Sequence, residues 1–175
     1  MLRNFVAFLA LLACAGAVVY FFFLWERFLN YIFWRKDPTS VILRLFLRKD
    51  KRTLKIFYEI WESAVDKDFK FRCPWITTTK QWVRPSPFWG RAYLSKNMIV
   101  ITGYLINQLN DSELSAVIAH ELGHLIDYQT KRKGHPFFTP EKAALLGNEM
   151  MAWEIADYIT SPEIVDNYFT KRNSL

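Results

Sequence analysis

Residues 110–134 read NDSELSAVIAHELGHLIDYQTKRKG, and the pentapeptide His120-Glu121-Leu122-Gly123-His124 at their centre contains two of the chain's three histidines. Residues four apart lie one above the other on the same face of a helix. If this stretch is helical, His120 and His124 can direct imidazole nitrogens at one zinc ion. Glu121 would project from the adjoining face and could act as a base toward a water molecule at the metal. A five-residue pattern also arises by chance, so its context has to support it.

Signals on both sides of the motif predict one continuous helix. Asn110 and Glu113 stand three residues apart, as an N-cap and a reciprocal N3 carboxylate require. An apolar stripe follows, formed by Leu114, Ile118, Leu122, Leu125 and Ile126. A neighbouring face carries Val117, His120, His124 and Asp127. We expect the helix to end at residues 131–134, with three cations before Gly134 at the C′ position. Two histidines held rigidly at mid-helix favour a metal site over two histidines merely satisfied in a core.

A catalytic zinc site needs a third protein ligand and an open fourth position. A further helix is predicted to begin at Thr139-Pro140, an N-cap residue followed by proline at the first helical position. It carries Glu149, which opens an E-x-x-A pattern in which the small Ala152 lets two helices approach closely. We therefore expect Glu149 to be the third ligand. Glu154 is the alternative, and a solvated helix carboxylate without a metal role fits either residue.

An apolar segment near the N-terminus predicts a membrane anchor. The 175-residue chain is 51% hydrophobic, and residues 5–25 contain no charged side chain. A helix of this length, rising about 1.5 Å per residue, crosses a hydrocarbon core of roughly 30 Å. Small residues at 13–17 also fit the cleavage site of a signal peptide or a lipoprotein leader. The apolar run continues well beyond them, so we expect an uncleaved single-span anchor.

The composition predicts three parts in the chain, which are an anchor at residues 1–26, a basic helical neck at 27–70 and a compact domain at 71–175. The neck is expected to contain one helix from Asp37 through Leu47 and another from about Thr53 to Val65. Positive-inside counting of its Lys and Arg residues places the domain in the cytoplasm. These charges suit anionic lipid headgroups or an ordinary solvated helix surface equally well. Two cysteines, Cys14 and Cys73, give no disulfide framework, which fits a reducing compartment.

Strand signals lie between the neck and the motif. Residues 75–79 and 82–83 are predicted to form strands, and 84–87 a loop because it contains two prolines. Residues 91–94 and 98–102 indicate a hairpin around 95–97. Together with the helices, these strands predict an α+β fold.

Residues 98–105 and 110–124 resemble the HtpX-like and CAAX-prenyl-protease-like membrane zinc endopeptidases. That family pairs a strand ending in T-x-G-L with N-D-x-E-L-x-A-V-x-A-H-E-x-G-H and a downstream E-x-x-A. The similarity covers roughly residues 91–157. It implies a gluzincin fold, with a small mixed sheet, the active-site helix below its edge strand and a helix bearing the ligand Glu149. It also implies that strand 98–102 is the edge to which an extended peptide substrate adds.

The chain departs from that family in two places. The family usually has Asp four residues after the ligand glutamate, where it can orient a zinc-bound imidazole, and this chain has Trp153. Asp127 or Asp157 could take that part. The family often has a histidine or tyrosine after the ligand helix to stabilise the oxyanion. Candidates here are His135, Tyr158 and Tyr168, although a loop histidine without a role also fits His135.

These observations predict a membrane-anchored zinc endopeptidase with one Zn²⁺ per chain, held by His120, His124 and Glu149. The metal is expected to polarise the scissile carbonyl and to lower the pKa of its water toward about 7. Glu121 would take the proton as general base and return it to the leaving amine. The expected partners are a protein or peptide substrate, membrane-associated in view of the anchor, and the lipid bilayer.

Two other classes of function are considered. A non-catalytic membrane adaptor with a structural or degenerate zinc site is suggested by Trp153 and by the unassigned oxyanion donor. A structural site, however, needs four ligands and has no use for Glu121 as a base. The net charge of +6 suggests a basic membrane-surface or nucleic-acid-binding protein. Its charges cluster beside the apolar segment and no nucleic-acid motif accompanies them, so we expect no nucleic-acid partner.

Overall fold

The structure is a computed structural model that describes residues 14, 16–18, 20, 21, 24, 25, 47–80 and 90–172, with side chains to residue 170. The chain divides into two compact units, residues 1–45 with 84–87 and residues 46–83 with 88–175. In the first unit, the described residues are helical. No helix among the described residues combines the length and the apolar character needed to cross a membrane. Most of the predicted span at residues 5–25 lies outside these residues.

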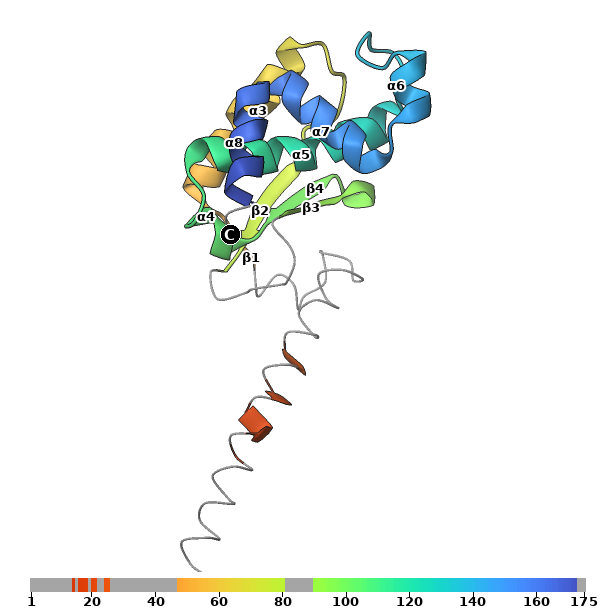
Figure 1. The fold of residues 1–175 in the computed structure, drawn as a ribbon. Coiled ribbons are helices and arrows are strands. Elements are labelled where there is room, and N and C mark those ends of the chain that lie inside the picture. Colours follow the sequence, from red (N-terminus) through yellow and green to blue (C-terminus); the bar gives the residue numbers. More distant parts are fainter. Residues whose placement is uncertain are drawn as a thin grey trace, which may run out of the picture. The chain divides into compact units, whose positions relative to one another are not determined.

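The second unit contains a small sheet and several helices (Figure 1). In chain order its elements are β1 (Leu47–Arg48), α3 (Lys51–Asp66), β2 (Trp75–Thr79), β3 (Gly90–Tyr93), the 3₁₀ helix η1 (Leu94–Lys96), β4 (Met98–Ile101), α4 (Gly103–Ile106), α5 (Asp111–Thr130), α6 (Pro140–Leu145), α7 (Asn148–Ile159) and α8 (Pro162–Arg172). The helix α5 runs between the sheet and the layer of α3, α7 and α8. The predicted α+β class with a small mixed sheet is confirmed.

The strand order of the sheet is β1-β2-β4-β3. The strands β2 and β4 are parallel, with Ile76 opposite Ile99, and the other two pairings are antiparallel. The predicted hairpin is confirmed as β3, η1 and β4. The predicted edge position of strand 98–102 is wrong, because β4 has a partner on each side. All four of its residues are buried, as a continuous apolar run in a central strand requires, and β3 is the edge beside it.

The sequence preceding α3 forms a strand where a helix was expected. Leu47, the last residue of the helix predicted from Asp37, pairs with Thr79 in β1, and the rest of that predicted helix lies outside the described residues. The hydroxyl groups of Thr77 and Thr78 each donate a hydrogen bond to the carbonyl of Arg48. This pairing across the fold outweighs the local helix preference. The predicted strand at 82–83 and loop at 84–87 also lie outside the described part of the chain.

The helix α3 confirms the prediction for residues 53–65 and begins two residues earlier. Asp50 is its N-cap and accepts a hydrogen bond from the Thr53 backbone N–H. One face of the helix buries Ile56, Phe57, Ile60 and Ala64 in the main hydrophobic core. Part of the segment predicted as a neck therefore belongs to the folded unit, whereas the boundaries at residues 26 and 70 stay predictions.

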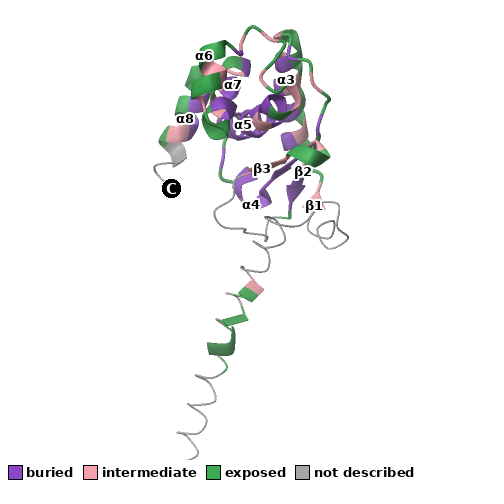
Figure 2. Cartoon of the chain, turned by 90° about the vertical axis from the view of Figure 1, so that its right-hand side faces the viewer, coloured by how far each residue is buried: buried purple, intermediate pink, exposed green. Residues whose placement is uncertain are grey.

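The helix α5 has the N-terminus that its sequence predicts. The Asn110 side chain accepts from the Glu113 N–H, and the Glu113 carboxylate accepts from the Asn110 N–H, which completes the capping box. The apolar stripe is fully buried, and α5 is the most deeply buried helix of the unit (Figure 2). The predicted C-terminal glycine is wrong. Lys131 is the C-cap in the left-handed conformation, with φ 51°, and Arg132 follows at φ 56° before Gly134.

The single helix predicted from Thr139 is two helices. The Thr139 side chain caps α6 as expected, but α6 ends at Leu145 and α7 begins at Asn148 with Gly147 as its N-cap. Leu146 has extended backbone angles, so the chain turns between the two helices. This break places Glu149 in the first turn of α7 instead of in the middle of a longer helix.

The packing of α7 on α5 depends on two small residues. A Cβ atom at Gly123 would lie 2.5 Å from the backbone oxygen of Ala152 and 3.0 Å from its Cα. Ala152 is fully buried, as the E-x-x-A pattern predicts for a close helix pair. Because the backbones meet here, residues on either side of this contact face each other across the two helices.

We expect Gly123→Ala to lower the free energy of unfolding by about 1–3 kcal/mol, because the added methyl group must push α7 away from α5. This loss should outweigh the gain of roughly 1 kcal/mol that alanine brings within a helix. Gly147→Ser is the control, since nothing lies within 4 Å of a Cβ at Gly147 and serine is a good N-cap. Urea unfolding measures both, and a Gly123→Ala variant as stable as the control contradicts the close contact.

Candidate metal centre

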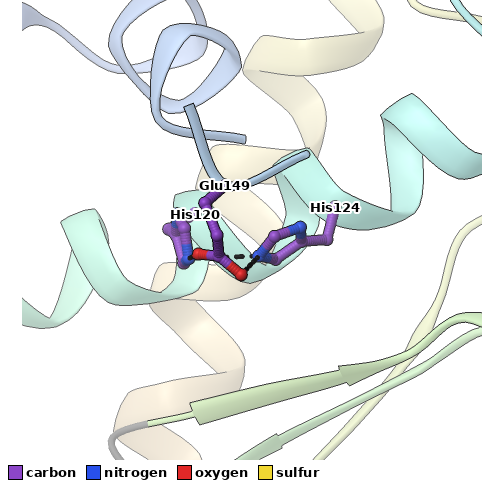
Figure 3. A group of neighbouring side chains, drawn as sticks. All are labelled: His120, His124 and Glu149. Carbon is purple, nitrogen blue, oxygen red and sulfur yellow. Dashed lines mark hydrogen bonds and ion pairs between the residues drawn. The ribbon is translucent and has the colours of Figure 1, made fainter. Parts of the chain in front are cut away.

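Three side chains that the sequence singled out meet at one point between α5 and α7. The Nε2 atoms of His120 and His124 are 3.2 Å apart. Glu149 Oε2 lies 3.4 Å from His120 Nε2, and Glu149 Oε1 lies 3.4 Å from His124 Nε2. The Glu149 carboxylate approaches from α7 and stands between the two imidazoles (Figure 3). Among the described residues, this trio forms a group of potential ligand atoms within 4.8 Å of one another.

The spacing of these atoms fits a tetrahedral zinc ion. Zinc bonds of about 2.0–2.1 Å to nitrogen and oxygen, at tetrahedral angles, separate neighbouring ligand atoms by roughly 3.3–3.4 Å. The two imidazole nitrogens are 3.2 Å apart, close to this value, and each lies 3.4 Å from a different oxygen of the Glu149 carboxylate. Two neutral imidazoles and one carboxylate form a donor set that zinc accepts, and it leaves a fourth position open. The residues present could therefore hold zinc in the arrangement of a catalytic site.

The trio is protected on one side and open on the other. The histidine side chains are only 11% and 18% exposed, whereas the Glu149 side chain is 79% exposed. Burial lowers the pKa of His124, partly offset by the Glu149 and Asp127 carboxylates, and a neutral imidazole is the form that binds a metal. Glu149 lies in the first turn of α7, where the helix dipole favours a negative charge. Solvent therefore reaches the site from the Glu149 side.

Glu121 is buried against the edge strand β3. Its carboxylate accepts a hydrogen bond from the Ala92 backbone, and a Cβ at Gly90 would lie 3.0 Å from its Cγ. Burial raises the pKa of Glu121 to about 8, with a smaller increase from the Glu149 carboxylate; the Ala92 hydrogen bond and the Arg91 charge oppose both. Sequence reasoning identified Glu121 but missed Gly90 and Ala92. In the sequence, this contact is marked only by the glycine that begins β3. That glycine can be explained only once the packing of the sheet on α5 is known.

Trp153 takes the place where the family has an aspartate, and it contacts a candidate ligand directly. Its ring stacks on the imidazole of His120 with centroids 4.0 Å apart and planes inclined by 25°. Tyr168 and Phe169 of α8 pack against the far side of Trp153, with centroids 5.4 Å and 4.7 Å away. The plane of the His120 ring is thus restrained by aromatic packing.

The other candidates from the sequence lie in different surroundings. Glu154, the alternative ligand, forms an ion pair with Lys142. Asp127 forms an ion pair with Arg132, and Asp157 lines a separate hollow together with Lys67 and Tyr158. None of these carboxylates joins the two histidines in the described structure.

The histidine considered for the oxyanion is part of an aromatic cluster. His135 stacks on Phe69 with ring centroids 4.1 Å apart, and Tyr158 packs against the same ring. Its Nδ1 accepts from the Phe137 N–H and its Nε2 contacts the Lys67 carbonyl at 2.6 Å, so both ring nitrogens are used there. Tyr168 is buried behind Trp153. The structure therefore brings neither His135 nor the two tyrosines to the metal trio.

A cavity of about 410 Å³ adjoins His124. It extends along the C-terminal end of α5 toward the break between α6 and α7. Its lining consists of Leu94, His124, Asp127, Tyr128, Lys131, Arg132, Leu146 and Asn148. The candidate metal centre therefore opens beside a hollow large enough for a side chain.

In the metal-free protein, the stability should fall as the pH rises above about 5. Folded Glu121 keeps its proton up to about pH 8, whereas an ordinary glutamate loses it near 4.5, so the folded state binds the extra proton between these values. Glu121→Gln binds no such proton, so its free energy of unfolding should not decrease for this reason as the pH rises. We therefore expect it to be more stable than the wild type at pH 9. Urea unfolding with a chelator present checks this. Equal pH slopes for the two proteins would contradict the buried state of Glu121.

The chain was compared with known proteins. The model of peptidase family M48 matches residues 65–133, a segment that contains β2, β3, β4 and the whole of α5. The segment includes His120, Glu121 and His124 and ends before Glu149. No curated protein and no solved structure gives a significant match. Over this segment, the resemblance predicted from the sequence is confirmed, and the chain is similar to the metallopeptidases of family M48.

Proposed function

We propose that this protein is a membrane-anchored zinc endopeptidase with His120, His124 and Glu149 as metal ligands. The observation that carries the proposal is the convergence of two imidazole nitrogens 3.2 Å apart with the Glu149 carboxylate, whose two oxygens each lie 3.4 Å from one of them, beside the buried carboxyl group of Glu121. A site with three protein ligands and an open side is the catalytic type of zinc site. The match to family M48 supports the same class of reaction.

The chemistry would be hydrolysis of a peptide bond. Zinc, when bound, would polarise the scissile carbonyl and make water acidic enough to lose a proton near neutral pH. Glu121, adjacent in sequence to the ligand His120, would take that proton and return it to the leaving amine. A positive metal charge nearby favours the ionised carboxylate, and so it opposes the effect of burial on the pKa of Glu121.

The substrate would bind as an extended peptide along β3. This strand is the last of the described sheet, and the Ala92 N–H already reaches the Glu121 carboxylate. A peptide added to such an edge gains backbone hydrogen bonds and lies beside the metal trio. The apolar residues 5–25 would anchor the chain in a bilayer, with the domain on the cytoplasmic side. Location at the membrane favours membrane-associated substrates.

The alternative function is a membrane adaptor in which the same trio holds the fold together. It is favoured by Trp153, which replaces the usual aspartate, and by the unassigned oxyanion donor. Its weakness is Glu121, because a structural zinc site has no need of a second carboxyl group, buried beside the ligands on α5.

Glu121→Gln should retain zinc and lose peptidase activity by about 10²-fold or more, since general-base catalysis contributes a factor of this size. The full-length protein would be assayed for zinc content by elemental analysis and for cleavage of casein as an unfolded substrate. Zinc retention with loss of cleavage supports the enzyme. Equal cleavage by both proteins, or the absence of zinc from both, would contradict it.

A pair of carboxylate variants tests the third ligand. Glu149→Gln should weaken zinc binding by at least about 10-fold, because it replaces a charged ligand by a neutral amide. Glu154→Gln, on the same helix, is the matched control and should bind zinc as the wild type does, since Glu154 pairs with Lys142 instead. Chelator competition measures both constants. A larger effect at Glu154 than at Glu149 would show the assignment to be wrong.

A further inference from the structure

Two arginines hold the two ends of α5 with the same kind of contacts. At the N-terminal end, Arg52 binds the Asp111 carboxylate and the carbonyl oxygens of Ile106 and Leu109. At the C-terminal end, Arg132 binds the Asp127 carboxylate and the carbonyl oxygens of two residues near the end of α6. In each case one guanidinium group connects a carboxylate of α5 to a neighbouring segment. The two sets of contacts differ in one respect, because only the segment held by Arg132 leads to a candidate metal ligand.

The segment held by Arg132 leads directly into Glu149. Arg132 Nε and Nη2 donate to the two oxygens of Asp127, at 2.9 and 3.1 Å. Its Nη1 donates to the carbonyls of Ala143 and Leu146, at 2.9 and 2.8 Å, and Nη2 also reaches Asn148 Oδ1 at 3.1 Å. Asn148 is the residue before Glu149. Three hydrogen bonds from Arg132 therefore converge on the break between α6 and α7.

The hydrogen bonds of Arg132 to Asp127 and to the break between α6 and α7, here called the clamp, lie close to the three candidate metal ligands. Asp127 lies three residues after His124 on α5 and is buried, and the Arg132 side chain that contacts it is partly buried, the two side chains being 10% and 19% exposed. The Asp127 hydrogen bond raises the pKa of Arg132 above its ordinary range, so the guanidinium remains charged. The Glu149 side chain itself is largely exposed, and its first helical turn has no side-chain cap because Gly147 is the N-cap. The start of α7 thus depends on other contacts for its position.

We propose that Arg132 is a positioning residue for the third ligand. By joining Asp127 on α5 to the carbonyls of Ala143 and Leu146, it fixes the start of α7 and holds Glu149 between the two histidines. The left-handed backbone of Arg132 and its preceding residue supports this role, since a non-glycine residue adopts that conformation at a cost of about 1–2 kcal/mol. The inference rests on the proposed zinc site, and it concerns metal affinity instead of the chemical step.

The direction of the change in zinc affinity distinguishes a positioning role of Arg132 from a direct effect of its charge. Arg132 lines the same cavity as His124, so removing its positive charge would by itself favour a bound cation. A loss of zinc affinity in Arg132→Gln must therefore come from the displacement of Glu149. Outer contacts that orient metal ligands typically change affinity by about 10- to 100-fold when removed.

The test measures zinc affinity and thermal stability in the full-length protein, by chelator competition and by unfolding of the metal-free form. Arg132→Gln should weaken zinc binding by about 10-fold or more, and Arg132→Lys should recover part of it by keeping one contact with Asp127. Arg52→Gln is the matched control, because it breaks the same kind of contacts, to a carboxylate and two carbonyl oxygens, roughly 14 Å along the helix from His120. It should lower the unfolding temperature and leave the zinc constant within about 2-fold.

Two results overturn the proposal, namely unchanged zinc affinity in Arg132→Gln, or an equal loss in Arg52→Gln. If Arg132→Gln does not fold, Arg132→Lys and Asn148→Ala decide the matter. Weaker zinc binding by both supports the clamp, and wild-type affinity in either contradicts it. Casein cleavage is measured separately. A wild-type protein that binds zinc without cleaving casein contradicts the proposed function alone.

Discussion

The backbone contact between Gly123 and Ala152 is the constraint on which the candidate site depends. Glycine and alanine at these positions let α5 and α7 approach until their main chains touch. At that separation, a carboxylate from the first turn of α7 can reach two imidazoles on α5. Larger residues would separate the helices and leave the histidines without their third partner. The packing of two small residues thus determines whether a metal site can exist.

Around this contact, His120, Glu149 and Glu121 are each held by a different kind of interaction. His120 lies against Trp153, which is packed on α8, so an aromatic stack restrains this imidazole. Glu149 is positioned through the start of α7, which Arg132 ties to α5. Glu121 is fixed by the edge strand β3, through the Ala92 hydrogen bond and the space left by Gly90. The helix α5 and the start of α7 are therefore supported from both the sheet and the helical layer.

Local signals in the sequence predicted the parts of the fold that local interactions determine. The capping box at Asn110 and Glu113, the N-cap Thr139 and the hairpin before α4 each depend on residues a few positions apart, and the structure has all of them. The errors in the sheet arose where distant segments meet. The central position of β4 requires its parallel partner β2, and the strand at Leu47 requires Thr79, about thirty residues away.

The candidate site could be predicted because a zinc site prescribes residue types at fixed spacings, so His120, His124 and Glu149 were recognisable before the fold was known. The support from Trp153, Arg132 and Gly90 comes from tertiary packing. X-ray absorption at the zinc edge of the full-length protein tests the central claim most directly. The account predicts two imidazole nitrogens and oxygen donors at about 2.0–2.1 Å with no sulfur. A thiolate at about 2.3 Å, or four protein nitrogen and sulfur ligands, would contradict it.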